Sequence, residues 1–421
     1  MKPTRVRYSV AGMALGINML CYTDRVCIAV AAPRIREDFG FNQQQMGLIL
    51  SIFSLAYAFG QAPWGAVADR FGSRGLISLA ILAWSAFTAL TAAAWSFTSL
   101  LAIRFIFGGL EAALSPATAA AFSRWVPVTE RSTVFGAFLS GGRLGGALTP
   151  PIAAWLMLQF GWRWMFPIFG LLGVGAAAIW YGWFRDDPAK HTAVNAGELE
   201  IIRRDAIPLL RTSERQRVPW KDVLSSGRLW CLMGVAFAAT FLWQFYITWF
   251  PTYLMEKRGL PLKEASYYAG LPFLLGVGAT WVGGLAADYL SRRLNVRTGR
   301  RIIGVVSLLG ASSLMLVGVL AVNPRVGALL MASAAFYVDL YLGAAWASAV
   351  DIGKSNGGAV AGLMNASSNA AGFVSPALMG WALHTRNDWN LVLLIGVAST
   401  AFAAVLWLGV TRADEKRLTT N

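Results

Sequence analysis

Long runs without a charged residue are the dominant feature of this chain of 421 residues. Five of these runs, which contain no Asp, Glu, Lys or Arg over more than 20 positions, each have the length of a single span: 164–184, 229–255, 265–287, 302–323 and 389–411. A helix needs about 20 apolar residues to cross a bilayer, whereas a surface helix of a soluble protein carries polar residues along one face. The runs therefore predict membrane-spanning helices. With 56% hydrophobic and 14% charged residues, the sequence excludes an ordinary soluble enzyme and a disordered chain.

Twelve spans account for the hydrophobic pattern once the run 75–103 is divided near Trp95-Ser96. The expected fold class is an all-α membrane protein with twelve transmembrane helices. The approximate spans are 9–31, 44–66, 75–94, 98–122, 133–157, 164–184, 229–254, 265–287, 301–322, 326–350, 357–382 and 389–411.

The basic residues indicate how these spans are oriented. Cytoplasmic loops retain Lys and Arg, and the segment 185–228 alone carries 9 of the 36 basic residues. We therefore expect both termini to be cytoplasmic. The net charge of +15 is then spread over loops between helices. A compact basic domain, which nucleic-acid binding would need, is not expected.

The polar segment 185–228 divides the chain into similar halves. We predict an N-terminal six-helix bundle over 1–184, a cytoplasmic linker over 185–228 and a C-terminal six-helix bundle over 229–421. Asn195-Ala-Gly-Glu198 predicts a capped short helix in the linker, with Ile201 and Ile202 available to rest on the bundle.

A similar short pattern follows the second span of each half. The first copy contains Gly65, Asp69, Arg70, Gly72 and Arg74, and the second contains Gly284, Asp288 and Arg292-Arg293. The glycine allows close helix packing, and the carboxylate at the membrane edge can pair with arginines or with a helix end. Either copy alone is also compatible with a tight loop that merely ends in charges. Two copies favour conformational gating by Gly65, Asp69, Arg70, Gly72, Arg74 and Asp288.

These features resemble the major facilitator superfamily over essentially the whole chain. More narrowly, Tyr22-Thr-Asp24-Arg25, the series Arg104…Glu111…Pro116 and Trp249-Phe-Pro251-Thr-Tyr253-Leu resemble the anion:cation symporter family. That family includes bacterial carriers of galactonate, glucarate and hexuronates. The resemblance implies two pseudo-symmetric six-helix bundles with a central site that opens alternately to each side, in the inner membrane of a bacterium.

Six ionisable residues lie inside predicted spans: Asp24, Arg25, Arg104, Glu111, Arg143 and Asp339. Each costs about 2.5–3.5 kcal/mol near the bilayer centre on insertion scales. Such residues persist only where they are paired or functional, so this group is the strongest indication of function in the chain.

Helix geometry limits how the first four can pair. Arg104 and Glu111 are seven positions apart on one helix face, about 10 Å along the axis, which is too far for an easy direct bond. The side chains of Asp24 and Arg25 diverge by about 100°. The simplest arrangement sets Asp24 near Arg104 and leaves Arg25 and Glu111 closer to a cavity.

The resemblance and the charge balance together imply a division of roles. Asp24 and Glu111 are predicted to carry protons, Arg25 to anchor the substrate carboxylate, and Arg104 to hold or modulate Asp24. A static Asp24–Arg104 pair that orients two helices is the alternative.

The roles of Arg143 and Asp339 are more open. Arg143 lies between two glycine pairs that allow a close helix approach. It is predicted either to clamp a second carboxylate, which favours a dicarboxylic sugar acid, or to make an internal pair. Asp339 is predicted to pair with Arg143, to tune coupling or to face a wet vestibule.

Uncharged polar residues in the spans complete a site suited to a hydroxylated acid. The predicted substrate-binding residues of this kind are Gln244, Tyr246, Asn365, Asn369 and Tyr57. Hydrogen bonding between helices of the bundle is the alternative use for them.

The function predicted from the sequence and the resemblance is proton-coupled uptake of a small organic anion, a sugar acid of the galactonate, glucarate or hexuronate type. The sequence contains no Walker A motif, and two histidines give little scope for a catalytic triad or a metal site. We therefore expect no enzyme activity and no cofactor, with the proton gradient as energy source. The expected partners are the anion, H⁺ and the lipid bilayer, and the expected state is a monomer. An exchanger or exporter of the same fold, and a membrane sensor that does not transport, are the alternatives.

Overall fold

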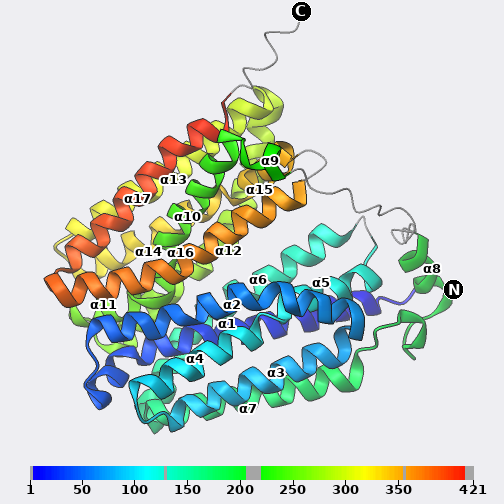
Figure 1. The fold of residues 1–421 in the computed structure, drawn as a ribbon, viewed down its shortest axis with the longest axis horizontal. Coiled ribbons are helices and arrows are strands. Elements are labelled where there is room, and N and C mark those ends of the chain that lie inside the picture. Colours follow the sequence, from blue (N-terminus) through cyan, green and yellow to red (C-terminus); the bar gives the residue numbers. More distant parts are fainter. Residues whose placement is uncertain (1–2, 128–129, 205–219, 354–356, 413–421) are drawn as a thin grey trace, which may run out of the picture. The chain divides into compact units, whose positions relative to one another are not determined.

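The computed structural model is built of helices, and no strand occurs among the residues it describes, which are 3–127, 130–204, 220–353 and 357–412 (Figure 1). The chain divides into two compact units, residues 1–216 and 217–421. The two units are described one at a time below.

Unit 1 contains the first six predicted spans. Its helices are α1 (Val6–Phe39), α2 (Gln43–Phe71), α3 (Ser73–Leu90), the short 3₁₀ turn η1 (Thr91–Ala93), α4 (Phe97–Glu111), α5 (Leu114–Trp125), α6 (Arg131–Phe160), α7 (Trp162–Trp183), the 3₁₀ turn η3 (Pro188–Lys190) and α8 (Ala196–Arg204).

Unit 2 contains the remaining six spans. Its helices are α9 (Trp220–Leu224), α10 (Gly227–Thr248), α11 (Phe250–Glu256), α12 (Leu262–Arg293), α13 (Val296–Leu320), α14 (Pro324–Leu340), α15 (Leu342–Gly353), α16 (Gly357–Arg386) and α17 (Trp389–Val410).

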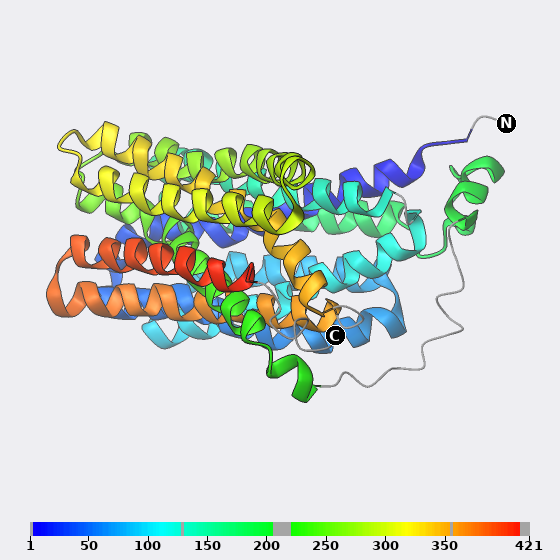
Figure 2. The ribbon, with the colours of Figure 1, turned by 90° about the horizontal axis from the view of Figure 1, so that it is seen from above.

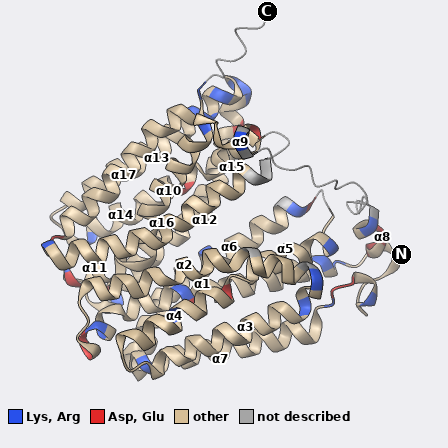
Figure 3. Cartoon of the chain, viewed as in Figure 1, with Lys and Arg blue, Asp and Glu red and all other residues tan. Residues whose placement is uncertain are grey.

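The twelve predicted spans all correspond to these helices. Over the described residues, nine helical segments are long and apolar enough to cross a membrane, and α2, α6 and α16 are each 29 or 30 residues long. The division of the run 75–103 is confirmed, because α4 starts after Ser96, whose side chain accepts a hydrogen bond from the Ser99 amide in a capping box. Seen from the view of Figure 2, the helices of each unit run as long rods. Figure 3 shows that charged residues gather mainly at the helix ends.

Three predicted spans are interrupted. The span 98–122 divides into α4 and α5, 229–254 into α10 and α11, and 326–350 into α14 and α15. The break between α10 and α11 has a simple cause, since Pro251 lies in the first turn of α11 and has no amide hydrogen to continue the hydrogen-bond ladder of α10.

The two units share one pattern of helix pairing. In unit 1 the most extensive contacts join α1 with α6, α2 with α4, and α3 with α7. The corresponding pairs of unit 2, α10 with α16, α12 with α14, and α13 with α17, also pack closely, and there α13 additionally packs on α14 and α10 on α17. Each corresponding pair joins the first to the fifth, the second to the fourth, or the third to the sixth span of its unit. This repeat agrees with the internal similarity predicted from the loops.

Glycines allow α6 to approach α1 closely. A Cβ atom at Gly141 or Gly145 would collide with the carbonyl oxygens of Leu15 and Met19, respectively. The side-chain amide of Asn18 also donates to the Phe138 carbonyl across the pair, at 2.7 Å. The expected close approach at this glycine-rich stretch is therefore confirmed, and it fixes the helix that carries Arg143 against the helix that carries Asp24 and Arg25.

The first part of the predicted linker folds onto unit 1. Asn195 caps α8 by accepting from the Glu198 amide at 2.9 Å, and Ile202 is buried against the unit, as expected. The Glu198 carboxylate reaches the start of α1. It is fully buried and accepts from the Thr4 hydroxyl and the amides of Val6 and Arg7, at 2.6, 3.0 and 3.1 Å. A linker carboxylate thus caps the start of α1, and Figure 1 shows α8 near the N-terminal end of the chain.

Candidate functional site

Four ionisable residues of unit 1 meet between α1 and α4. Asp24 and Arg25 lie on α1, and Arg104 and Glu111 lie on α4. Asp24 is 1% exposed and Glu111 is fully buried. Buried charges need partners to offset their lost hydration, so the contacts of these four residues define what the site can do.

Arg25 and Glu111 form a direct ion pair. The Arg25 Nε and Nη2 atoms both contact Oε1 of Glu111, and the Arg25 side chain is 17% exposed. Oε2 of Glu111 is buried and accepts no hydrogen bond within the described residues. The third guanidinium nitrogen of Arg25, Nη1, takes no part in this ion pair. One end of the guanidinium is therefore bound to a buried carboxylate while the side chain keeps some access to solvent.

Aromatic rings surround the Arg25 guanidinium. Its central carbon lies 5.0 Å from the ring centroid of Tyr22, 4.9 Å from that of Phe53 and 4.5 Å from that of Tyr57. The Tyr57 hydroxyl is 3.3 Å from that of Ser115 on α5. Cation–π contacts of this kind fix a guanidinium without satisfying its N–H donors. The three rings thereby hold Arg25 in one orientation, with the Tyr57 ring nearest to its guanidinium.

Asp24 and Arg104 interact without forming a bond. Each acts electrostatically on the other. In the described part of the chain, however, both carboxylate oxygens of Asp24 and the Nε atom of Arg104 lack a hydrogen-bond partner. The Arg104 guanidinium carbon lies 4.6 Å from the Phe107 ring centroid and 5.4 Å from that of Phe53. The expected neighbourhood of Asp24 and Arg104 is thus present, and the tight static pair is not.

Comparisons with known proteins place the whole chain in one family. The profile described as Major Facilitator Superfamily matches residues 14–376. The chain belongs to the major facilitator superfamily. It is a multi-pass membrane transporter and not an enzyme, because the members it resembles are transporters.

Curated superfamily members of similar length resemble this chain closely. A probable sulfoacetate transporter of Cupriavidus necator is 32% identical over 95% of this chain and 93% of that protein. A hexuronate transporter of Bacillus subtilis is 30% identical over 92% of this chain and 90% of that protein. A probable galactarate/D-glucarate transporter of Bacillus subtilis is 31% identical over 96% of this chain and 91% of that protein.

Solved structures show the same fold. A bacterial homolog of the human lysosomal transporter Spinster, in an inward-facing and occupied conformation, aligns with a TM-score of 0.75 at 20% identity, covering 97% of this chain and 98% of that chain. The twelve-helix architecture predicted from the sequence is therefore confirmed as the major facilitator fold.

The superfamily loop motif between α2 and α3 is held by a residue that the sequence did not indicate. The Asp186 carboxylate, just after α7, accepts from the amides of Ser73 and Arg74, at 2.6 and 3.3 Å. It caps α3 while Gly72 turns the chain at a φ of +83°. A Cβ atom at Gly72 would lie 2.8 Å from Oδ2 of Asp186, so the motif glycine makes room for this carboxylate.

The other motif residues show varied placements. Arg74 donates from Nε to the Tyr181 carbonyl at 2.8 Å, and Arg70 is exposed. Gly65 faces Pro116 of α5, where an added Cβ would lie 3.8 Å from the Pro116 Cβ. The side chain of Asp69 lies outside the described residues. In the second copy Asp288 is exposed, and the closest helix contact falls on Gly283, against the Leu340 carbonyl, one position before the expected Gly284.

We expect Asp186→Ala to lower the thermal unfolding temperature of the purified protein by about 2–8 °C. The substitution removes the cap of α3 and leaves its first amides without an acceptor, a loss of about 1–2 kcal/mol. Asp187→Ala is the control, because Asp187 accepts from Ala189 in a single 3₁₀ turn. Equal unfolding temperatures for the two variants would contradict the capping role of Asp186.

The predicted site residues of unit 2 divide into a half-buried and a buried group. Gln244, Asn365 and Asn369 are half-buried, and the Asn369 side chain donates to the Asn365 carbonyl at 3.1 Å. Asp339 is buried in α14. Tyr246 is also buried, and its hydroxyl donates to the Met331 carbonyl at 2.7 Å. This placement argues against the substrate contact expected of Tyr246, because the hydroxyl is already bonded inside unit 2.

The segment 249–254 of span seven serves the structure of unit 2. The Trp249 indole donates to the Pro376 carbonyl at 3.2 Å, and the Tyr253 hydroxyl accepts from Nε of Arg258 at 2.6 Å. Arg258 also donates to the carbonyls of Gly318, Val319 and Ala321, at 2.5, 3.0 and 2.6 Å. A cation at these last carbonyls stabilises the C-terminal end of α13.

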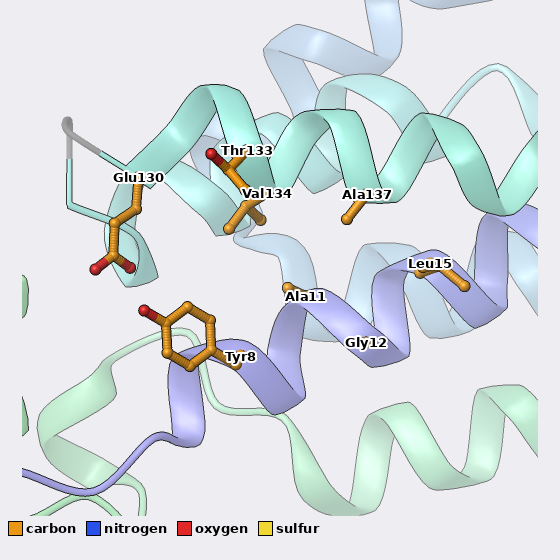
Figure 4. Close-up of a pocket in the computed structure, with 8 residues that line it drawn as sticks. All are labelled: Tyr8, Ala11, Gly12, Leu15, Glu130, Thr133, Val134 and Ala137. Carbon is orange, nitrogen blue, oxygen red and sulfur yellow. The ribbon is translucent and has the colours of Figure 1, made fainter. Parts of the chain in front are cut away.

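A separate pocket of about 500 Å³ opens between the first turns of α1 and α6 (Figure 4). Its lining is mostly apolar, with Tyr8 and Glu130 at one end, as Figure 4 shows. Glu130 accepts from Nε of Arg7 at 2.9 Å, and this hydrogen bond holds the pKa of Glu130 below its usual range. None of the eight lining residues is basic. The pocket is therefore poorly suited to an anion, unlike the surroundings of Arg25.

Proposed function

We propose that this transporter carries out proton-coupled symport, in the direction of uptake, of a small organic anion of the sugar-acid type by alternating access. The observation that carries the proposal is the Arg25–Glu111 ion pair in unit 1, held among aromatic rings beside a second buried carboxylate, Asp24. The curated relatives support the substrate class.

The relatives are named for sulfoacetate, hexuronate and galactarate or D-glucarate. All of these substrates carry a carboxylate, and the sugar acids carry several hydroxyl groups. A guanidinium binds a carboxylate through parallel N–H bonds, which suits Arg25. Tyr57, Gln244, Asn365 and Asn369 are proposed to bind hydroxyl groups. Tyr246 is left out of this set because its hydroxyl is already bonded.

Competition for Arg25 provides the coupling. A proton on Glu111 removes the negative partner of Arg25 and frees its N–H donors for the anion. An anion that displaces Glu111 leaves a buried carboxylate without its cation, which favours protonation. Each ligand therefore strengthens the binding of the other, and this reciprocity is what a symporter requires.

The charge balance of the site favours an anion once protons are loaded. Arg25 and Arg104 balance Asp24 and Glu111 when both carboxylates are ionised. Protonation of both leaves two positive charges in a poorly hydrated environment, which is suited to an anion. Arg143 is proposed to bind a second acid group, and Asp339 to adjust coupling.

The proposed location, topology and energy source are those predicted from the sequence. The transporter is proposed to act as a monomer in the bacterial inner membrane, with both termini in the cytoplasm and the proton gradient as its energy source. No cofactor is required. The loop motifs around Asp69 and Asp288 are proposed to exchange partners during gating.

Uptake into proteoliposomes tests the proposal. Labelled sulfoacetate, glucuronate, glucarate and galactonate are offered with and without an inwardly directed proton gradient, and with a protonophore. We expect at least one acid to accumulate with the gradient and not with the protonophore. Uptake that requires an anion loaded inside, and ignores the gradient, would identify an exchanger. Failure of all four acids in uptake and counterflow would contradict the proposal.

A further inference from the structure

We propose that His191 is a pH-sensitive latch for the linker segment, residues 188–204. Its neutral imidazole holds this segment on unit 1, and a proton on the ring releases the segment together with the cap that it supplies to α1. His191 lies outside the predicted spans and takes no part in the ion pair of Arg25 and Glu111.

The His191 ring is enclosed where the chain leaves α7. The residue is 7% exposed, and its ring centroid lies 4.6 Å from that of Trp183 and 5.5 Å from that of Trp125, at interplanar angles of 67° and 89°. Trp125 is itself fixed, because its indole donates to the Arg185 carbonyl at 2.7 Å. Two tryptophans, at the ends of α5 and α7, therefore shield the imidazole from water.

One hydrogen bond identifies the protonation state of the docked ring. Nδ1 of His191 accepts from the Ala193 amide at 3.2 Å. An imidazolium carries N–H on both ring nitrogens and accepts no hydrogen bond. A proton on Nδ1 would therefore set two donors against each other. The docked segment requires the neutral imidazole, with its proton on Nε2.

The turn at His191 leads directly into the contacts that dock the linker segment. The Val194 amide donates to the His191 carbonyl at 3.1 Å. The next residue, Asn195, accepts from the Thr4 amide at 3.2 Å and from the Glu198 amide at 2.9 Å. Glu198 in turn caps the first turn of α1. A charged His191 thus disturbs the turn on which α8 and this cap depend.

The charged groups around His191 oppose one another. Arg185, just after α7, disfavours a proton on the ring, and Glu198 of α8 favours one. Asp187 and Lys190 of the adjoining turn η3 are exposed, and the two tryptophans add no charge. Burial and the positive charge of Arg185 lower the pKa of His191 below its usual value.

The lowered pKa sets the direction of the pH effect. A released imidazole is hydrated and takes up a proton near its ordinary pKa of about 6.5, whereas the docked ring resists protonation. The released state therefore binds more protons below that pH. Docking is complete above about pH 6.5 and weakens as the pH falls from there through the lowered pKa of the docked ring.

The latch has a consequence for transport. Under the proposed topology the linker segment lies in the cytoplasm, the compartment to which proton symport delivers protons. A latch that opens on acidification would then respond to the acid that the transporter brings in, and it would act on α1, which carries Asp24 and Arg25. This physiological role rests on the proposed function, whereas the opening of the latch does not.

Hydrogen–deuterium exchange of the purified protein tests the latch without an anion or a proton gradient. The protection of amides in the linker segment, and of Val6 and Arg7 in α1, is compared at about pH 7.5 and about pH 5.5, each relative to the intrinsic exchange rate at that pH. We expect protection in both regions to fall by about three- to tenfold at the lower pH, the range that one imidazole can supply one pH unit below its ordinary pKa.

Two substitutions at His191 remove the titration and keep part of the packing. In His191→Asn the side-chain oxygen can accept from the amide two positions on, as in an Asx turn, and His191→Phe fills the space between the tryptophans. We expect the protection in both variants to be independent of pH over this range. A fall in protection at low pH that is equal in both variants and the wild-type protein, or no fall in the wild-type protein, would overturn the proposal.

His384→Asn is the matched control, because His384 is the other histidine of the chain and is exposed near the end of α16. We expect it to lose protection at low pH as the wild-type protein does. A pH-independent His384→Asn would assign the response to the wrong histidine and would also contradict the latch.

The outcome is distinguishable from the fate of the proposed function. If exchange does not respond to His191 while proteoliposomes accumulate an anion under a proton gradient, the latch is wrong and proton-coupled uptake stands. If exchange responds as expected but no acid is taken up, the latch stands and its role in symport falls.

Discussion

Arg25→Lys is expected to reduce the initial rate of anion uptake in proteoliposomes by about 100-fold, equivalent to about 2.7 kcal/mol. Lysine keeps the positive charge, so the loss measures the guanidinium itself. Its plane contacts the rings of Tyr22, Phe53 and Tyr57, and two of its nitrogens share one oxygen of Glu111. A flexible ammonium reproduces neither the stacking nor the parallel N–H geometry.

Arg163→Lys provides the matched control for this effect. The Arg163 guanidinium carbon also lies over aromatic rings, 4.2 Å from the Trp162 centroid and 5.3 Å from that of Phe39. It sits in the first turn of α7, away from Glu111. We expect uptake by this variant to stay within about twofold of the wild-type rate, since exposed contacts of this kind contribute little. Uptake by Arg25→Lys that matches this control would argue against Arg25 as the substrate anchor.

Glu111→Gln is expected to abolish accumulation of the anion against its gradient and to retain counterflow. Glutamine has the shape of the protonated acid, so Arg25 loses its buried counter-ion and is continuously available to the anion. Exchange of one labelled anion for another needs no net proton movement and should continue. Accumulation requires the proton to load and leave, and glutamine cannot do this.

The surface pair Glu264–Arg325 supplies the control for Glu111→Gln. Its Arg325 Nε and Glu264 Oε1 atoms are 2.5 Å apart, and the Arg325 side chain is 69% exposed. We expect Glu264→Gln to leave accumulation and counterflow unchanged, because exposed ion pairs contribute little. Continued accumulation by Glu111→Gln under a proton gradient would remove Glu111 from the set of proton carriers.

The sequence predicted the helices and the residues of the site more fully than the contacts between them. Long apolar runs located all twelve spans, because the bilayer requires a minimum apolar length. Charges inside those runs indicated Asp24, Arg25, Arg104 and Glu111. Helix spacing gives distances along one helix, however, and not the distance between two helices. Helix spacing therefore could not predict the ion pair between Arg25 and Glu111, because these residues lie on different helices.

Contacts between distant segments account for most of what the sequence did not indicate. Asp186 caps α3, which begins more than 100 positions earlier in the chain. Arg258 caps the end of α13, about 60 positions later. Tyr246 looked like a substrate residue because it is polar within a span, but its hydroxyl is bonded to the Met331 carbonyl. Polar groups of this kind are recognised only when their burial and neighbours are known.

The cap that Glu198 supplies to the start of α1 has a consequence for dividing the protein into separately expressed halves. A fragment that stops at position 184 keeps six spans but exposes the Val6 and Arg7 amides and loses the carboxylate that Nη1 of Arg7 contacts at 3.2 Å. A fragment extended through Arg204 retains both Glu198 and the Asn195 side chain that positions its helix. The folded part of unit 1 therefore extends beyond its last membrane helix and includes residues 185–204, which the sequence alone assigns to a linker.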